Sequence, residues 1–200
     1  MLRRLRARLD LPSAATAAAI PPDDWPICHG FSPAVVPRPA DWPAAAQVRG
    51  YWWPARPPGW QPPDLLVAFL AAGPPPVFVG FGSMTPNHER LDDVTATLVH
   101  HAGAGTTGAG LRAGVPAVPV PVLVDQPFWA DRLHRLGVAP PPLPLRELTA
   151  DTLTEALRSC LDGPTYRERA TDLAHRTRAD DGPGAVLSLI TRLEGNRGQP

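Results

Sequence analysis

One stretch of the sequence, from Val99 to Asp131, combines glycines, histidines and threonines in an order that suits an anionic ligand. An apolar run from Val94 to Val99 leads into two histidines, a glycine-rich turn and a short helical pattern. Glycines let the backbone approach a phosphate closely, and the first N–H groups of a helix point towards such a ligand. The hydroxyls of Thr106 and Thr107 and a ring nitrogen of His101 can add donors, so we expect an anion site here.

A second apolar run, from Ala117 to Val124, ends at a carboxylate and an amide, those of Asp125 and Gln126. Both groups can exchange hydrogen bonds with neighbouring hydroxyls. A third run, from Pro76 to Met84, predicts a strand buried in a parallel sheet, because it is apolar throughout. Gly82 and Ser83 follow it at the carboxyl edge, where open α/β sheets bind ligands. We therefore expect an α/β fold with a small, parallel, Rossmann-like sheet.

A dinucleotide site is one interpretation of the glycine-rich turn. Three glycines satisfy G-x-G-x-x-G between a strand and a helix, and Asp125 lies about 20 residues further on, where the ribose acid is expected. However, Pro119 and Pro121 interrupt what would have to be a central strand. Gln126 and Pro127 follow the acid at once, which is typical of a loop that opens a new helix. The three glycines are Gly103, Gly105 and Gly108.

The second interpretation is a resemblance carried by three motifs in order. They are His-His-Ala-Gly-Ala-Gly-Thr-Thr at 100–107, Leu-Arg-Ala-Gly-Val-Pro at 111–116 and Asp-Gln-Pro-Phe-Trp-Ala at 125–130. Together they resemble the donor-binding signature of UDP-sugar glycosyltransferases with the GT-B fold. The most similar branch contains the sterol glucosyltransferase-like and the antibiotic glycosyltransferases. The family usually has glycine after the second histidine, whereas this chain has Ala102, whose methyl group disfavours a positive φ.

This resemblance implies two groups of binding residues. One group would hold the diphosphate of a UDP-sugar, and the other would contact hydroxyls of the sugar. No catalytic residue is implied, because the histidine that acts as general base in the family lies in a part of the acceptor domain with no match here. The implied diphosphate residues are Gly82, Ser83, His101, Gly103, Gly105 and Thr106, and the implied sugar residues are Asp125 and Gln126.

The segment from Thr85 to Asp93 is too short for its expected place. It joins the run ending at Met84 to the run beginning at Val94, and a parallel crossover needs about a dozen residues or more. The resemblance implies that several strand–helix units, including the one that binds uracil, are deleted here. We therefore expect the two strands to be hindered from taking their usual places.

Residues 1–75 are expected to be a remnant of the acceptor domain followed by a proline-rich linker. The chain contains 28 prolines, and the residues at 31–39, 41–43 and 50–52 resemble the crossing between the two domains of the family. Residues 76–195 would form a partial donor domain, and residues 196–200 a tail. A helical pattern covers Asp64 to Ala72.

The C-terminal half is expected to be helical. Pro127 suits the first position of a helix that Gly137 would stop. Thr149 or Thr152 can cap the next helix, and Thr152 with Glu155 would form a capping box. Gly163-Pro164 and Gly182-Pro183 start two more helices, and the last one is expected to pack on the core. Its apolar residues are Val186, Leu189, Ile190 and Leu193.

Composition excludes several classes of function. The formal net charge is zero, so nothing indicates nucleic acid as a partner. All 19 basic residues are arginine, which excludes a Walker lysine and a Schiff-base lysine. Cys28 and Cys160 stand far apart, so we expect two thiols, no metal site and a cytoplasmic protein. No apolar run approaches 18 residues, so no transmembrane helix is expected.

The expected function is transfer of a hexose from a UDP-sugar to a hydroxyl of a lipid-like or natural-product acceptor, without a cofactor. Two alternatives stay open. One is an inactive remnant that still binds a nucleoside diphosphate, and the other is an NAD-binding protein.

Overall fold

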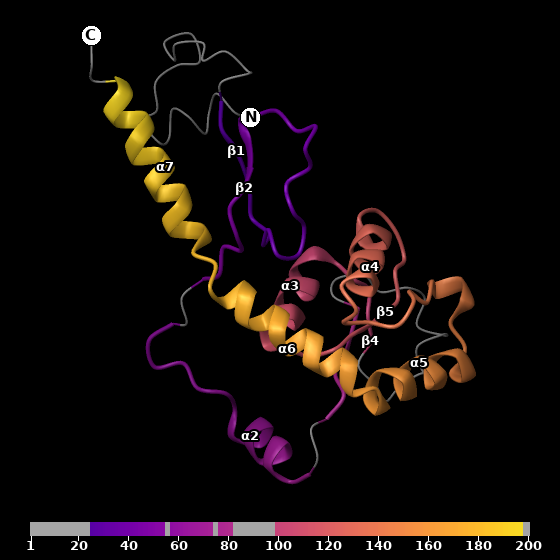
Figure 1. Cartoon of the computed structure of the whole chain (residues 1–200). Coiled ribbons are helices and arrows are strands. Elements are labelled where there is room, and N and C mark those ends of the chain that lie inside the picture. The colour runs from indigo at the N-terminus through magenta and orange to yellow at the C-terminus, as the bar shows by residue number, and fades with distance from the viewer. Residues whose placement is uncertain (1–24, 55–56, 74–75, 82–98, 198–200) are drawn as a thin grey trace, which may run out of the picture.

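The computed structural model describes residues 25–54, 57–73, 76–81 and 99–197, and it is a mixed α/β structure (Figure 1). Two small parallel sheets and six α-helices make up the described chain. The expected α/β class with a helical C-terminal half is confirmed. In chain order the elements are β1 (Ile27–His29), β2 (Ala46–Val48), α2 (Asp64–Ala71), β3 (Val79–Gly80), β4 (Val99–His100), α3 (Ala104–Ala113), β5 (Val118–Pro119), α4 (Gln126–Arg135), the 3₁₀ turn η4 (Leu145–Glu147), α5 (Ala150–Asp162), α6 (Pro164–Arg178) and α7 (Gly182–Arg197).

The larger sheet has the order β3-β4-β5, with all described pairs parallel. Val79 pairs with Val99, and Val99 pairs with Val118. β5 covers only Val118–Pro119 of the apolar run from Ala117 to Val124 that predicted it. β3 and β4 are neighbours in one parallel sheet. The segment from Thr85 to Asp93 lies outside the described residues, so the expectation that it hinders the two strands from taking their usual places stays a prediction.

Proline is tolerated in β5 because a residue beside it makes the backbone bond to β4. The N–H of Val120, not of Pro119, donates to the carbonyl oxygen of His100 at 2.9 Å. The carbonyl oxygen of Pro119 accepts instead from the N–H of Leu143, also at 2.9 Å. The missing N–H of Pro119 is thus not needed for the β4 ladder.

Two hydrophobic clusters form the core. Alternate residues of the β5 segment point to opposite sides, so Ala117 belongs to one cluster and Val118 to the other. Buried side chains of α3, α4 and α6, including Leu111, Leu133 and Leu173, form the first cluster. The second contains the β4 and β5 valines together with Leu153, Leu157 and Cys160 of α5. The helices therefore cover both faces of the sheet, which suits strands that are apolar throughout.

The helix boundaries agree well with the sequence signals. Pro127 occupies the first turn of α4, and Gly137 follows that helix with φ of 70°. Thr149 is the N-cap of α5 and exchanges side-chain hydrogen bonds with the backbone and side chain of Thr152. The predicted capping box between Thr152 and Glu155 was wrong, because the box forms one turn earlier.

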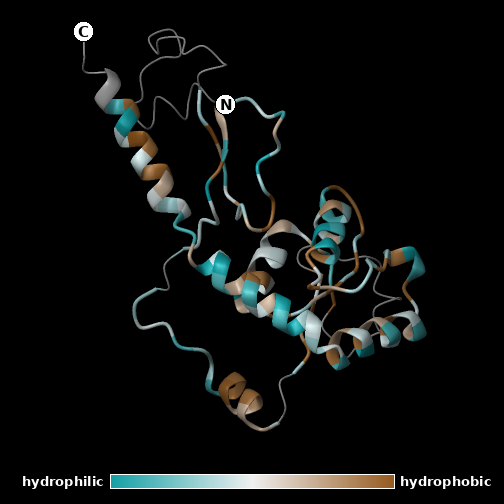
Figure 2. Ribbon diagram, viewed as in Figure 1, coloured by the Kyte–Doolittle hydropathy of each residue, from teal (hydrophilic) through white to brown (hydrophobic). Residues whose placement is uncertain are grey.

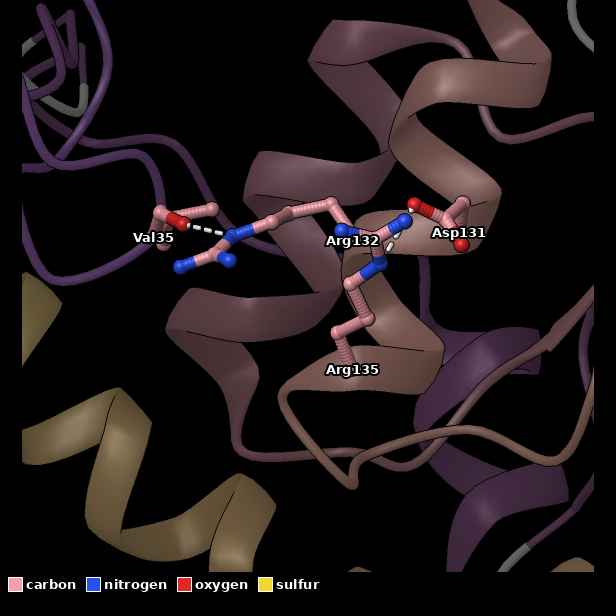
Figure 3. A network of polar contacts seen from close by, with 4 residues as sticks. All are labelled: Val35, Asp131, Arg132 and Arg135. Carbon is pink, nitrogen blue, oxygen red and sulfur yellow. Dashed lines mark hydrogen bonds and ion pairs between the residues drawn. The ribbon is translucent and has the colours of Figure 1, made fainter. Parts of the chain in front are cut away.

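The N-terminal segment, residues 25–54, packs onto the helices. Val35 and Tyr51 are buried in the first cluster, and the guanidinium of Arg132 on α4 donates to the carbonyl oxygen of Val35 (Figure 3). Arg135 on the same helix forms an ion pair with Asp131 at 2.8 Å (Figure 3). The N-terminal segment is thereby attached to α4. The parallel pairing of β1 with β2 was not expected from the sequence.

Two helices present apolar side chains to solvent. Helix α2 has the predicted extent but no buried residue, and Figure 2 shows it as an apolar helix set apart from the others. Helix α7 begins near the end of α6 and extends away from the other helices (Figure 1), and its Leu187 is 63% exposed. The expectation that α7 packs on the core was wrong, because none of its four predicted packing residues is buried. In the described ranges no helix combines the length and apolar character needed to cross a bilayer.

Candidate functional site

The glycine-rich turn lies between a central strand and the helix that follows it. Strand β4 ends at His100, and α3 begins at Ala104 with Gly103 as its N-cap. Ala102 has φ of 58°, so a left-handed residue turns the chain into the helix. This conformation costs a residue with a Cβ atom about 1–2 kcal/mol. The strand, turn and helix that the sequence predicted are therefore present.

The N-terminus of α3 carries no side-chain cap. Gly103 has no side chain to offer, and the first turn of the helix contains no acidic residue. The first intrahelical bond runs from the N–H of Thr107 to the carbonyl oxygen of Gly103 at 2.9 Å. By helix geometry the N–H groups of Ala104, Gly105 and Thr106 have no intrahelical acceptor. An anion would satisfy these donors and interact favourably with the helix dipole.

His101 lies directly beside this N-terminus. Its side chain is 8% exposed, and its Nδ1 atom is buried with no hydrogen-bond partner among the described residues. A Cβ atom added at Gly103 would lie 2.5 Å from Nε2 of His101, so the ring occupies the space that a larger residue at 103 would fill. A buried ring nitrogen without a partner is costly, and a ligand oxygen is one group that can remove this cost.

The neighbouring histidine has a different environment. His100 is 5% exposed, and its Nδ1 atom accepts a hydrogen bond from the N–H of Ala102 at 3.1 Å. Burial first, and then the nearby His101, lower the pKa of His100 to about 4. His100 is therefore neutral near pH 7. Separate roles for His100 and His101 could not be predicted, because the two residues are adjacent and identical in type.

The two threonines also differ. Thr107 is 1% exposed and faces the core, whereas Thr106 is only partly buried. Gly105 is exposed, and a Cβ atom added there would have no neighbour within 4 Å. Of the two threonines considered for an anion, only Thr106 is partly exposed. The open space at Gly105 leaves room for a ligand against the backbone.

Asp125 and Gln126 lie at the start of α4, after β5. Asp125 is exposed, and its Oδ2 atom accepts from the indole N–H of Trp129 at 2.9 Å. Gln126 is 4% exposed, and its Oε1 atom accepts from the N–H groups of Val122 and Leu123 at 2.8 and 3.1 Å. Both residues therefore support the loop before α4. The sequence did not indicate this structural use of Gln126.

The loop before α4 also contains a strained residue. Val124 has φ of 59° and is 85% exposed. A β-branched residue with positive φ is a genuine outlier, and such strain concentrates at functional sites. The bonds that Gln126 makes to the loop hold this conformation in place.

The structure thus brings His101, Gly103, Gly105 and Thr106 together around one helix N-terminus. Asp125 and Gln126 follow the neighbouring strand of the same sheet. Gly82 and Ser83 lie outside the described residues. Within the described ranges no group of three or more histidine, cysteine or acidic side chains is arranged to hold a metal ion. The expected free thiols are confirmed, since Cys28 and Cys160 form no disulfide.

Comparison with known proteins supports the resemblance seen in the sequence. The O-mycaminosyltylonolide 6-deoxyallosyltransferase of Streptomyces fradiae is 35% identical over 207 aligned residues, which cover 82% of this chain and 49% of that protein. A sterol 3-beta-glucosyltransferase of Arabidopsis thaliana is 31% identical over 216 residues, covering 84% of this chain and 34% of that protein. The chain spans half the length of these relatives or less. The resemblance to antibiotic and sterol glycosyltransferases is therefore confirmed.

The alignments also contain internal gaps. The alignment with the Streptomyces protein is longer than the whole 200-residue chain, although it uses only 82% of the chain. Aligned positions without a residue from this chain must make up the difference. This finding is what an internal deletion would produce.

A crystal structure of the glycotransferase of kitacinnamycin is also similar, with 34% identity and a TM-score of 0.44 over 47% of this chain and 24% of that chain. Residues 73–193 match the family described as erythromycin biosynthesis protein CIII-like, C-terminal domain. This match covers more than half of the chain and includes every described residue of the glycine-rich turn. The chain therefore belongs to the erythromycin biosynthesis protein CIII-like C-terminal domain family of glycosyltransferases.

Proposed function

We propose that this chain binds the diphosphate of a UDP-sugar at the turn between β4 and α3, as the donor-binding part of a hexosyltransferase. The observation that carries the proposal is the uncapped N-terminus of α3 with the buried, unpartnered Nδ1 of His101 beside it. Family membership adds that the relatives are transferases of sugars. No metal or cofactor belongs to the proposal, and the UDP-sugar is the donor substrate.

The chemistry of such a site is electrostatic. When the bond between the sugar and the diphosphate breaks, negative charge develops on the leaving diphosphate. The N–H groups at the start of α3 are already oriented towards that position, so they stabilise the charge without reorganising. His101 would add a ring N–H donor from the strand side. Donors of this kind act on charge that is larger in the transition state than in the ground state, and they therefore increase the rate.

Asp125 and Gln126 are proposed to bind hydroxyl groups of the sugar. Asp125 suits this role because it is exposed and its carboxylate has two oxygens, one of which accepts from Trp129. The Oε1 atom of Gln126 is already used by two backbone donors, so Gln126 would contribute mainly by holding the loop. One relative is named as a deoxyallosyltransferase and another as a glucosyltransferase, and we propose a hexose as the common sugar class. The acceptor would be a hydroxyl of a lipid-like or natural-product molecule.

A second candidate function is binding of a nucleoside diphosphate without transfer. It is favoured by the positions of the other described histidines, since a transferase also needs a base on the acceptor side. The ring of His29 packs against Trp42 in a tilted arrangement with centroids 4.4 Å apart, and Nδ1 of His134 contacts the carbonyl oxygen of Ala139. His175 is exposed on α6. None of these three lies at the β4–α3 turn. We therefore propose that the 200-residue chain by itself binds UDP but transfers no sugar above background.

Calorimetric titration of the purified chain with UDP, UDP-glucose and NAD tests these proposals. Measurable binding of UDP and UDP-glucose, with none of NAD, is expected. Binding of NAD alone would overturn the diphosphate-sugar site in favour of a dinucleotide site. A transfer assay with a sterol or polyketide acceptor separates the two candidates. Sustained turnover would overturn the non-transferring alternative.

A further inference from the structure

His100 makes a contact that the binding site described above does not use. The residue lies in β4, paired with Gly80 on one side and Pro119 on the other, and its carbonyl oxygen accepts from Val120. Its backbone is therefore fixed by the sheet. Its side chain lies against the residues that follow it, and Nδ1 accepts from the N–H of Ala102, two residues further on, at 3.1 Å. Both His100 and Ala102 are buried, with exposures of 5% and 0%.

The partner of this bond is the strained residue of the turn. Ala102 has φ of 58°, a conformation that residues with a Cβ atom adopt rarely. Its N–H is buried, so without the ring of His100 this donor would be unsatisfied. The left-handed conformation of Ala102 would then also lose a bond that stabilises it. The ring of His100 supplies that acceptor from a strand that is paired on both sides. The direction in which the chain leaves β4 therefore depends on His100.

This direction decides where the proposed ligand groups point. His101 and Gly103 flank Ala102, and the helix whose N–H groups would bind the diphosphate starts at Ala104. If Ala102 relaxed to a negative φ, the ring of His101 and the N-terminus of α3 would no longer meet as they do at Gly103.

We propose that His100 is a positioning residue for the diphosphate site: with its proton on Nε2, its ring holds the left-handed turn at Ala102 that aims His101 and the N-terminus of α3 at one point. This inference rests on the proposed function. It requires a neutral ring, because a protonated imidazole has two donors and no acceptor. Burial, and then the proximity of His101, lower the pKa of His100 to about 4, so the required form is the one present near pH 7.

Two substitutions separate this role from core filling. In His100→Asn the side-chain oxygen is attached to Cγ, as Nδ1 is, so it can accept from the N–H of Ala102. In His100→Leu a side chain of similar bulk fills the space but accepts nothing. His175→Leu, on an exposed face of α6, is the matched control for replacing a histidine by leucine.

UDP affinity of these variants is measured by calorimetry, with thermal unfolding recorded for each. We expect His100→Leu to bind UDP at least tenfold more weakly than the wild type. His100→Asn should stay within about threefold, and His175→Leu should be unchanged, a tenfold change being 1.4 kcal/mol. Equal affinity of the leucine and asparagine variants, whether both are normal or both are weak, would overturn the inference while leaving the UDP site standing. Absence of UDP binding by the wild type would overturn the proposed function and this inference together.

A second measurement does not depend on the folding of any variant. ¹⁵N NMR of histidine-labelled wild-type protein distinguishes a ring nitrogen that carries a proton from one that does not. We expect the His100 signals to show a protonated Nε2 and an unprotonated, hydrogen-bonded Nδ1 at pH 7. A proton on Nδ1 would overturn the inference, because that atom could not then accept from Ala102.

Discussion

Nε2 of His101 lies where a residue larger than glycine at position 103 would place its side chain, 2.5 Å from the added Cβ atom. Gly103 has φ of −64° and ψ of 146°, which alanine adopts without strain. The effect of Gly103→Ala should therefore come from displacement of the His101 ring alone. We expect this variant to bind UDP more weakly by about 1–3 kcal/mol, the range for a lost charge-assisted hydrogen bond.

A double-mutant cycle checks this explanation of Gly103→Ala. In the background of His101→Ala there is no ring to displace, so adding Gly103→Ala should change UDP affinity little further. Additive losses in the double variant would mean that residue 103 acts independently of the histidine.

Gly105 and Gly110 form a matched pair within α3. A Cβ atom added at either position has no neighbour within 4 Å, so alanine should stabilise the helix in both cases by about 0.5–1 kcal/mol. Only Gly105 lies in the first turn, where the diphosphate is proposed to approach the backbone. We expect Gly105→Ala to weaken UDP binding and Gly110→Ala to leave it unchanged, with unfolding and calorimetry measured on both. Equal UDP affinity of the two variants would place the ligand elsewhere.

Val124 and Ala102 share a positive φ but differ in burial. Replacement by glycine removes about 1–2 kcal/mol of strain and costs about 0.5–1 kcal/mol of backbone entropy. At Ala102, which is fully buried, glycine also loses a buried methyl group worth about 0.8 kcal/mol. We therefore expect Val124→Gly, 85% exposed in the native chain, to raise the free energy of unfolding by about 0.5–1 kcal/mol, and Ala102→Gly to change it little. Denaturant unfolding of both variants tests the comparison, and destabilisation by Val124→Gly would contradict it.

Asp125 is best tested with asparagine, because the carboxylate also accepts from Trp129. Asp125→Asn removes the charge but keeps an oxygen for the indole N–H, so the loop should persist. We expect a loss of affinity for UDP-glucose of about 1 kcal/mol, the scale of one hydrogen bond, and a smaller loss for UDP. Trp129→Phe serves as the control for the structural contact. Equal losses of affinity for UDP and UDP-glucose in Asp125→Asn would show that this residue supports the loop and does not bind the sugar.

Local signals in the sequence predicted the helices well. Pro127, Gly137 and Thr149 each act through the backbone of their own helix end, so their effect does not depend on the rest of the fold. The glycine-rich turn was predictable for the same reason. The strands were less predictable, since an apolar run says that a segment is buried but not how much of it pairs.

Features that depend on distant contacts could not be predicted. The pairing of β1 with β2 joins two segments rich in proline, and nothing in either segment specifies its partner. The expected packing of α7 failed because an apolar stripe does not say which surface covers it. The different roles of His100 and His101 depend on where β4 ends, because His100 is its last residue and His101 belongs to the turn. The sequence does not indicate this boundary.

The most direct test of the account is a calorimetric titration of UDP into the wild type and into His101→Ala, with thermal unfolding as a check that both are folded. The variant should bind UDP more weakly by about 1–3 kcal/mol, because it loses the ring donor while the N-terminus of α3 remains. Unchanged UDP affinity in a folded His101→Ala variant would contradict the claim that the turn between β4 and α3 binds the diphosphate through His101.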